Sequence, residues 1–340
     1  MKHKGSIALK EPSFWYISAS TNPLQRLFLT GLSTLFRFGA AVKKTLTRTR
    51  TVDKPVICIG NLTVGGAGKT PVTLSIAQYF KGQGKKVAII SRGYKGKLNG
   101  PLLVNPTMHT AQDVGDEPLL LSLSCTTWIS ANRYKGAKAA IEKGADIILL
   151  DDGLQHSTLK QDLKICVIDA RRGFGNKKIM PAGPLREPLD SGLERVDAFI
   201  VVGNADVHRL TFDEIKKPLL QATISINKDD WAVLKNKRLV AFAGLANPKK
   251  FFETLRLEDF NVQHTISFPD HHFYTEEELK SLQQTAKEYC ADLVTTQKDW
   301  VRLPRNLQKN IHQLRIQLDY EERHLFKGLL DSFDKKEEGK

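Results

Sequence analysis

One stretch, Pro55 to Pro71 with the sequence PVICIGNLTVGGAGKTP, constrains the fold more than any other part of the chain. An apolar, β-branched run at residues 56–59 leads into a glycine-rich turn, and Lys69-Thr70 then opens a helical pattern. This order of strand, glycine-rich loop, Lys-Thr and helix is typical of a phosphate-binding P-loop. Glycines let backbone N–H groups converge on phosphate oxygens, and the helix N-terminus adds the positive end of its dipole. The sequence therefore predicts that a nucleoside triphosphate binds at Thr63, Val64, Gly65, Gly66, Ala67, Gly68, Lys69 and Thr70.

Two side chains of this loop have specific expected roles. Lys69 is expected to reach the β- and γ-phosphates, and the Thr70 hydroxyl is expected to ligate Mg²⁺. The loop departs from the usual pattern at Thr63, where a glycine normally stands, so its entry is expected to differ from a standard one. The alternative is a glycine-rich turn that binds nothing. The coincidence of strand, loop, Lys-Thr and helix argues against that alternative.

Composition places the chain among soluble globular proteins, with 41% hydrophobic and 26% charged residues over 340 positions. The net charge of +14 is concentrated at the start, because residues 1–55 hold ten Lys and Arg against two acids, a balance of +8. Such a local excess indicates a polyanionic surface, either anionic lipid headgroups or nucleic acid. The four cysteines form no Cys-x-x-Cys pair, so we expect buried thiols in a reducing cytosol rather than a zinc or redox site.

The N-terminal region predicts an amphipathic helix that begins at Asn22-Pro23, with Asn22 as N-cap. Apolar residues recur at helical spacing as far as Val42, but Arg26 and Arg37 interrupt the run well short of a membrane span. A helix on the membrane surface is favoured over one that packs on the protein core, because basic residues flank it. Residues 1–20 show no signal-peptide cleavage site.

Downstream, apolar strands alternate with helices, which predicts a P-loop NTPase-type α/β fold with a doubly wound, mostly parallel sheet. The strand that ends at Asp151-Asp152 has the Walker B arrangement, so both carboxylates are candidate ligands of Mg²⁺ or its water, the alternative being a strand end that caps the next turn. We expect four parts: a membrane-associating helix and basic linker at residues 1–50, a P-loop core at 51–210, a smaller α/β lobe at 211–330 and a charged tail at 331–340.

Seven motifs stand together in this chain: Asn61–Pro71, Ser91–Tyr94, Gly115–Pro118, Asp151–His156, Met180–Pro188, Phe268–His271 and Thr295–Asp299. In combination and order they resemble the tetraacyldisaccharide 4′-kinase family, the lipid A 4′-kinases, from the N-terminal helix to about residue 303. That family's loop also begins with threonine. Two positions differ: Leu154 stands where an aromatic residue is expected, which suggests a packing change, and Gln297 replaces a glutamate.

The resemblance implies an ATP- and Mg²⁺-dependent kinase that phosphorylates the 4′-hydroxyl of an acylated glucosamine disaccharide 1-phosphate, giving lipid IVA. It implies work at the cytoplasmic face of the inner membrane, as a peripheral or monotopic protein, with a lipid substrate, no nucleic acid and no obligate protein partner. It points to Asp116 and His271 as a carboxylate–imidazole pair that accepts the hydroxyl proton. The alternatives are a helix N-cap for Asp116 and a solvated loop histidine for His271. Glu187 is a further Mg²⁺ candidate, and Arg92, His156 and Arg186 are candidate substrate contacts.

A second hypothesis is a P-loop switch or maturation factor that hydrolyses nucleotide and binds a protein or nucleic-acid partner. The chain lacks the lysine of the deviant Walker loop, since Val64 stands there, and it has no guanine-reading Asn-Lys-x-Asp. Its N-terminal aromatic residues lie within an apolar helical pattern instead of alternating with basic residues along a groove. The lipid kinase is therefore the favoured interpretation.

Overall fold

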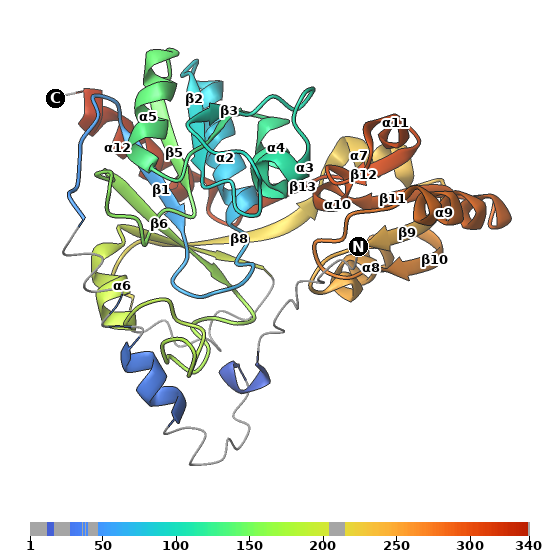
Figure 1. Cartoon of the computed structure of the whole chain (residues 1–340), viewed down its shortest axis with the longest axis horizontal. Coiled ribbons are helices and arrows are strands. Elements are labelled where there is room, and N and C mark those ends of the chain that lie inside the picture. Colours follow the sequence, from blue (N-terminus) through green and yellow to red (C-terminus); the bar gives the residue numbers. More distant parts are fainter. Residues whose placement is uncertain are drawn as a thin grey trace.

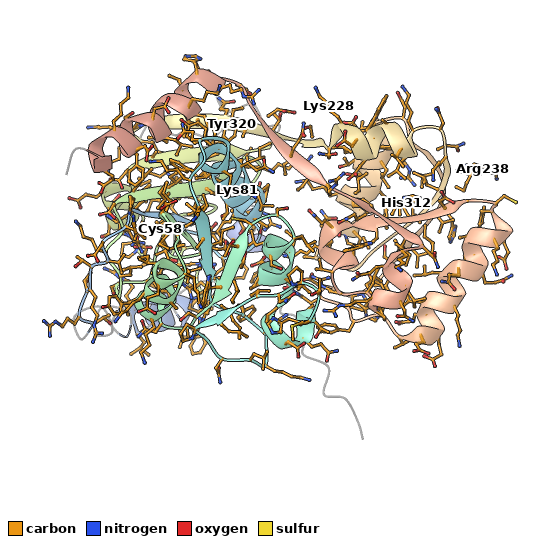
Figure 2. All side chains as sticks on the ribbon, turned by 90° about the horizontal axis from the view of Figure 1, so that it is seen from above. Cys58, Lys81, Lys228, Arg238, His312 and Tyr320 are labelled. Atoms are coloured by element: carbon orange, nitrogen blue, oxygen red, sulfur yellow. The ribbon has the colours of Figure 1, made fainter. Side chains whose placement is uncertain are left out.

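The computed structural model describes residues 12–16, 28–35, 37, 39, 47–203 and 215–338. These residues form two lobes, each built on its own β-sheet (Figure 1). Viewed from above, the larger lobe contains Cys58 and Lys81, and the smaller lobe contains Lys228, Arg238 and His312 (Figure 2). The prediction of a P-loop α/β core with a second, smaller α/β lobe is confirmed.

The larger lobe is a nine-stranded sheet with the order β13-β8-β7-β6-β1-β5-β2-β4-β3. All neighbouring strands pair in parallel except β3 with β4 and β13 with β8. The P-loop strand β1 lies near the middle, between β5 and β6. The strands are β1 (Val56–Gly60), β2 (Val87–Ser91), β3 (Leu102–Leu103), β4 (Thr126–Ile129), β5 (Ile147–Asp151), β6 (Leu163–Asp169), β7 (Ala198–Val202), β8 (Leu219–Ile226) and β13 (Ile316–Tyr320).

Helices cover both faces of this sheet, which explains why its central strands are apolar on both sides. Ile57 and Ile59 of β1 face one cluster, which includes side chains from α2 (Lys69–Gly82), α4 (Asp116–Ser122) and α12 (Arg323–Glu338). Val56 and Cys58 alternate to the other face, against α5 (Arg133–Glu142) and α6 (Leu189–Arg195). The fully buried strand β1 therefore holds the start of the P-loop in a rigid position.

The smaller lobe is a four-stranded parallel sheet with the order β10-β9-β11-β12. Helices α7 and α8 pack on one face and α9 on the other. The elements are α7 (Lys228–Leu234), β9 (Arg238–Ala243), α8 (Pro248–Leu257), β10 (Asn261–Ser267), α9 (Glu276–Glu288), β11 (Asp292–Thr296), α10 (Gln297–Trp300), α11 (Arg305–Gln308) and β12 (Ile311–Leu314).

The expected boundaries at residues 211–330 and 331–340 differ from this arrangement. Strands β8 and β13 both belong to the larger sheet, and they pair with each other in antiparallel fashion. Helix α12 extends to Glu338 and packs Phe326, Leu330 and Phe333 into the core of the larger lobe. The smaller lobe is thus inserted between β8 and β13, a connection that composition along the chain cannot reveal.

The two lobes meet at α4 and at the short helix α3 (Ala111–Val114) of the larger lobe. Val301, from just after α10, is buried in a cluster with Val114, Leu119 and Leu120. Arg305 adds hydrogen bonds to backbone carbonyls of residues 106–109. This interface fixes where residues of the smaller lobe stand beside the first turn of α4.

The described N-terminal residues pack against a loop of the larger lobe. Trp15 is buried and donates from Nε1 to the Pro181 carbonyl at 3.1 Å. Residues 28–35 are helical, and the buried Ser33 hydroxyl donates to the Ile179 carbonyl at 2.8 Å. The predicted helix start at Asn22-Pro23 lies outside the described residues. No helix within the described ranges is long and apolar enough to cross a membrane.

Candidate active site

The P-loop connects β1 to α2 with glycines at the positions where the backbone turns. Gly65 and Gly68 have φ values of 100° and 84°, in the left-handed region that favours glycine. Gly68 caps α2, and Gly65 and Gly66 are exposed. The Lys69 ammonium lies 3.3 Å from the Asn61 Oδ1 atom. Its position and the open glycines suit a loop that receives phosphate.

Thr63 has a structural reason to replace glycine in this loop. It forms an antiparallel bridge with Leu185, and the flanking N–H groups of Val64 and Arg186 donate to the carbonyls of Pro184 and Leu62 at 2.9 Å and 2.8 Å. The loop entry is therefore an extended segment paired to residues 184–186, so a β-branched residue fits it. The loop entry that the sequence predicts to be unusual is therefore this bridged segment.

Asp151 ends β5 and Asp152 follows it, and the carboxyl end of β5 lies beside that of β1. Asp151 is fully buried and accepts from the Ser91 hydroxyl at 3.2 Å. Burial, together with the nearby charge of Glu117, raises the pKa of Asp151 to about 7. Burial also opposes ionisation of Asp152, but Lys69 at 3.6 Å and Arg186 at 2.9 Å lower the pKa of that carboxyl overall.

Glu187 and Arg186 lie together next to the Walker B carboxylates. Arg186 donates to both carboxylate oxygens of Asp152, at 2.9 Å and 3.1 Å, and to Gln155 at 3.3 Å. Glu187 accepts from Gln155 at 2.8 Å and forms an ion pair with Arg195. Two of the four expected metal ligands, Asp152 and Glu187, are thus already paired with cations of the protein.

The donor set fits Mg²⁺ only when nucleotide phosphates complete the site. No group of three His, Cys, Asp or Glu side chains among residues 12–16, 28–35, 37, 39, 47–203 and 215–338 is arranged to hold a metal ion. Mg²⁺ usually takes one or two carboxylates and substrate phosphates rather than an all-protein cage. Asp151, with a raised pKa and a single hydroxyl donor on its side chain, is a carboxylate that a cation would stabilise.

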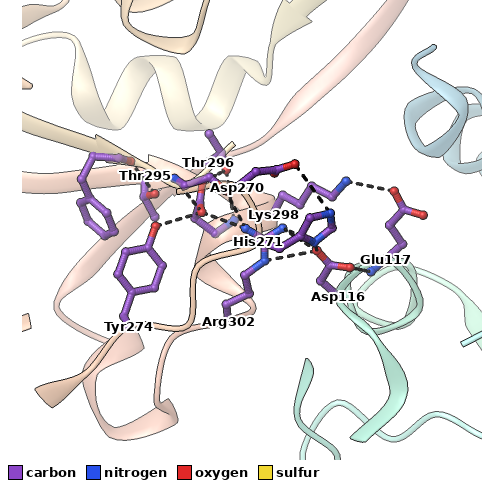
Figure 3. A network of polar contacts seen from close by, with 12 residues as sticks. Asp116, Glu117, Asp270, His271, Tyr274, Thr295, Thr296, Lys298 and Arg302 are labelled. Carbon is purple, nitrogen blue, oxygen red and sulfur yellow. Dashed lines mark hydrogen bonds and ion pairs between the residues drawn. The ribbon is translucent and has the colours of Figure 1, made fainter. Parts of the chain in front are cut away.

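Asp116 and His271 come from different lobes and meet at the interface. Asp116 is the first residue of α4, whose N-cap is Gly115, and its Oδ1 atom accepts from the Glu117 N–H at 3.0 Å. The His271 Nδ1 atom lies 2.9 Å from Asp116 Oδ2, as the close view shows (Figure 3). The N-cap of α4 is thus Gly115 rather than Asp116, and His271, whose side chain is 27% exposed, has Asp116 as a partner.

The backbone holds His271 in an unusual conformation. Its φ of 58° lies in the left-handed region, which costs a residue with a side chain about 1–2 kcal/mol. The His271 N–H donates to the Gly244 carbonyl at 3.2 Å, and the neighbouring His272 is bonded to Glu278 at 2.8 Å. The loop thus points two adjacent histidines to different partners, and only His271 faces Asp116.

Two candidate substrate contacts, Arg92 and His156, do not take part in the contact between Asp116 and His271. Arg92 is exposed at the end of β2, and no ion pair is found for it within the described part of the chain. His156 is half-buried, and its backbone N–H donates to the Gly153 carbonyl at 2.9 Å. Leu154 is buried and its side chain lies against Gly60, a position that suits the packing role expected for it.

Arg302 is a residue that motif reasoning missed. It donates to Asp116 Oδ2 from Nε at 3.2 Å and from Nη2, and it pairs with Asp299 at 3.1 Å (Figure 3). Lys298 similarly pairs with Glu117 at 2.9 Å. Its sequence signal is weak, because Arg302 lies three residues beyond the Thr295–Asp299 motif.

The P-loop, the Walker B carboxylates and the sheet around them define a P-loop kinase. Residues 25–334 match the family described as tetraacyldisaccharide-1-P 4′-kinase, and the chain belongs to that family. It is 40% identical over 317 residues to a tetraacyldisaccharide 4′-kinase of Rhodospirillum centenum, covering 92% of this chain and 94% of that one. It is 43% identical over 309 residues to one of Hyphomonas neptunium, covering 89% and 91%.

A solved structure agrees. The crystal structure of the "apo" form of LpxK from Aquifex aeolicus in complex with ATP has a TM-score of 0.72 and 29% identity, and the match covers 91% of this chain and 99% of that one. The family predicted from the motifs is confirmed.

Proposed function

We propose that this chain transfers the γ-phosphoryl group of ATP to the 4′-hydroxyl of tetraacyldisaccharide 1-phosphate, forming lipid IVA in lipid A biosynthesis. Relatives that match over about nine-tenths of its length are named tetraacyldisaccharide 4′-kinases. The observation that carries the proposal is the meeting of Asp116 and His271, 2.9 Å apart, beside a P-loop core. A sugar hydroxyl needs such a pair because it must lose its proton as the new bond forms.

The P-loop residues position the phosphates. Exposed N–H groups at Gly65 and Gly66 and the start of α2 provide hydrogen-bond donors, and Lys69 provides the charge. The Lys69 ammonium lies 3.3 Å from Asn61 Oδ1 and 3.6 Å from Asp152 Oδ1, so it is directed toward the site. Positioning and charge neutralisation are the main demands of phosphoryl transfer.

The Thr70 hydroxyl and Asp151 would hold Mg²⁺, with Asp152 acting on its water ligands. These residues would place the ion where it would neutralise charge on the phosphates. Asp152 and Glu187 are also paired with Arg186 and Arg195, so in addition these two carboxylates would orient the cations around the site. Asp151 and Asp152 are adjacent in sequence, but we assign them different roles.

In the transfer step the bond between the 4′-oxygen and the γ-phosphorus forms, and the bond to the bridging oxygen breaks with its electron pair leaving on ADP. The hydroxyl proton leaves through the Asp116–His271 pair. Arg186 and Arg92 are the cations we assign to the phosphates of the two substrates, and His156 to a hydrogen bond with the sugar. Arg186 is the better placed of the two, since it already contacts Asp152.

The substrate is a lipid, and residues 28–35 offer a surface for the bilayer. Phe28, Leu32 and Leu35 are 66%, 37% and 70% exposed, while Ser33 faces the protein. An apolar helix face with a basic flank suits a peripheral site on anionic lipids. We place the enzyme on the cytoplasmic face of the inner membrane, where ATP is available, without nucleic acid or an obligate protein partner.

A γ-labelled ATP assay with tetraacyldisaccharide 1-phosphate in mixed micelles tests this function. Label should appear on the lipid with the wild-type protein and fall below detection with Lys69→Ala, because the P-loop lysine is lost. Label released only as free phosphate, with or without lipid, would refute the kinase and support the nucleotide-hydrolysing switch.

A further inference from the structure

The loop that follows β6 carries positive charge that the proposed chemistry does not use. Residues 170–186 contain five Lys and Arg and no Asp or Glu. Arg186 lies at the candidate active site, but the other four side chains are exposed at the surface of the larger lobe: Arg171, Arg172, Lys177 and Lys178. We call residues 170–180 the basic loop. So much charge of one sign on a single loop favours a polyanionic partner.

The backbone of the basic loop is fixed by the fold. The Asn176 N–H donates to the Trp15 carbonyl at 2.7 Å, and the Asn176 side-chain amide donates to the Ala182 carbonyl at 3.0 Å. Its Oδ1 atom accepts from the Lys178 N–H at 3.1 Å, and Phe174 is buried in the core of the larger lobe. The cations are therefore presented from an ordered backbone, which lowers the entropic cost of binding.

The basic loop lies against both described N-terminal segments. The Arg172 guanidinium lies 5.3 Å from the centroid of the Tyr16 ring. The Ile179 carbonyl, directly after the two lysines, accepts from the Ser33 hydroxyl at 2.8 Å. Figure 1 shows the two N-terminal segments, in blue, at the same end of the larger lobe as the yellow-green loop. Cations and the helix of residues 28–35 thus share one surface.

The exposed apolar side chains of that helix decide between polyanions. Phe28, Leu32 and Leu35 follow one another at spacings of four and three, so they lie on one side of the helix. Nucleic acid would neutralise the cations of the basic loop but would leave these side chains in water. A bilayer surface accepts both, because its phosphates meet the cations and its acyl boundary takes the apolar side chains.

Protein carboxylates do not neutralise the whole basic loop. The nearest acid in sequence, Asp169, accepts from the Arg171 and Arg172 N–H groups at 2.8 Å and 3.2 Å, so it holds the backbone of the turn. No ion pair is found for Arg171 or Lys178 in the part of the chain that the structure describes. These two exposed cations can therefore meet lipid phosphate without first giving up a partner there.

We propose that the basic loop binds the phosphate groups of anionic phospholipids and forms, with the helix of residues 28–35, a single surface that rests on the bilayer. The inference goes beyond the kinase function, but it uses the bilayer contact assigned above to the helix. The same stretch of chain continues to Leu185, which bridges Thr63 of the P-loop, and to Arg186, which pairs with Asp152. Lipid binding at the basic loop therefore sets the height of the active site above the membrane.

The test is sedimentation with vesicles of equal parts phosphatidylcholine and phosphatidylglycerol, compared with vesicles of phosphatidylcholine alone. The double variant Arg171→Gln/Lys178→Gln should bind the anionic vesicles about 25-fold more weakly, because each cation at such a surface contributes roughly fivefold. Its binding to the neutral vesicles should equal that of the wild type. High salt should remove the difference between the two proteins, since it screens exposed charge. Unchanged binding to anionic vesicles at low salt overturns the inference.

The matched control removes two exposed cations from another part of the larger lobe. Lys135 lies on α5 and Lys143 directly follows it, and Figure 1 shows α5 at the opposite end of the lobe from the helix of residues 28–35. Lys135→Gln/Lys143→Gln should bind both kinds of vesicle as the wild type does. Equal weakening in the two double variants would show that only net charge matters, and it overturns the inference. Arg171→Lys/Lys178→Arg keeps both charges and should bind like the wild type; weaker binding with unchanged thermal unfolding contradicts an electrostatic contact.

Two further measurements distinguish other sources of phosphate. The KM for tetraacyldisaccharide 1-phosphate in micelles of neutral detergent should be unchanged in Arg171→Gln/Lys178→Gln, and a raised KM would assign the loop to the substrate's own phosphate instead. Tighter binding of the wild type to a single-stranded oligonucleotide than to the anionic vesicles, lost in the same variant, would overturn the inference in favour of nucleic acid. A failure of the kinase function would appear as an absence of labelled lipid with the wild type, and the vesicle measurements do not depend on it.

Discussion

Because a single hydrogen bond of 2.9 Å joins Asp116 and His271, their contributions to the rate should not be independent. We expect Asp116→Asn and His271→Gln each to lower kcat by about 100- to 1,000-fold, within the range for a general base, which is about 2.7–4 kcal/mol of barrier. The double variant should be no slower than the slower single variant, since the first change already disables the pair. The coupling free energy should then nearly equal the smaller single effect.

The assay is the initial rate of label transfer to the lipid at saturating ATP, with thermal unfolding of each variant measured in parallel. His272→Gln is the matched control, because His272 is adjacent in sequence but bonds Glu278 instead of Asp116. It should change kcat less than about threefold. Single effects that multiply in the double variant, or a His272 variant as slow as the His271 variant, would refute the argument that these two groups act as one unit.

Three further predictions follow from the loop, the interface and the N-terminal helix. Gly68→Ala should lower the free energy of unfolding, measured in urea, by about 1–2 kcal/mol, because φ is 84° and the new methyl group meets Val202 at 3.0 Å. Gly66→Ala, with open space around it, should leave stability unchanged but weaken ATP binding. Folding depresses the pKa of Asp116, so the wild type should be more stable than Asp116→Asn above the ordinary pKa of 3.8, and this difference in the free energy of unfolding should shrink as pH falls below it. A difference that is undiminished at about pH 2 contradicts this. Replacing the three exposed apolar side chains of residues 28–35 by serine should reduce sedimentation with anionic vesicles without changing ATP affinity, and unchanged sedimentation would exclude this face as the contact.

Local sequence was sufficient to predict the parts of the fold that depend on short-range rules. The apolar run at residues 56–59 lies in β1, and the apolar strand predicted to end at Asp151-Asp152 is β5. Thr63 was recognised as a departure, but its bridge to Leu185 joins residues far apart in the chain. Pairing of this kind is decided by tertiary contacts.

In the candidate site, too, short motifs could be recognised in the sequence, whereas contacts between distant residues could not. Asp116 and His271 were identified through motifs, although their 155-residue separation gives no hint that they touch. Arg302 carries no motif of its own, and one arginine near a strand end is usually a surface residue. Its importance becomes visible only when burial, Asp299 and Asp116 are considered together.

The insertion of the smaller lobe between β8 and β13 has a consequence for how the protein is made. A ribosome synthesises the P-loop early, but the edge strand β13 and the covering helix α12 emerge last. Phe326, Leu330 and Phe333 of α12 complete the apolar cluster under the P-loop helix. The core of the nascent nucleotide-binding lobe is therefore complete only after the whole smaller lobe has been synthesised. A chain that is cut short within the smaller lobe exposes apolar surface that chaperones and proteases recognise.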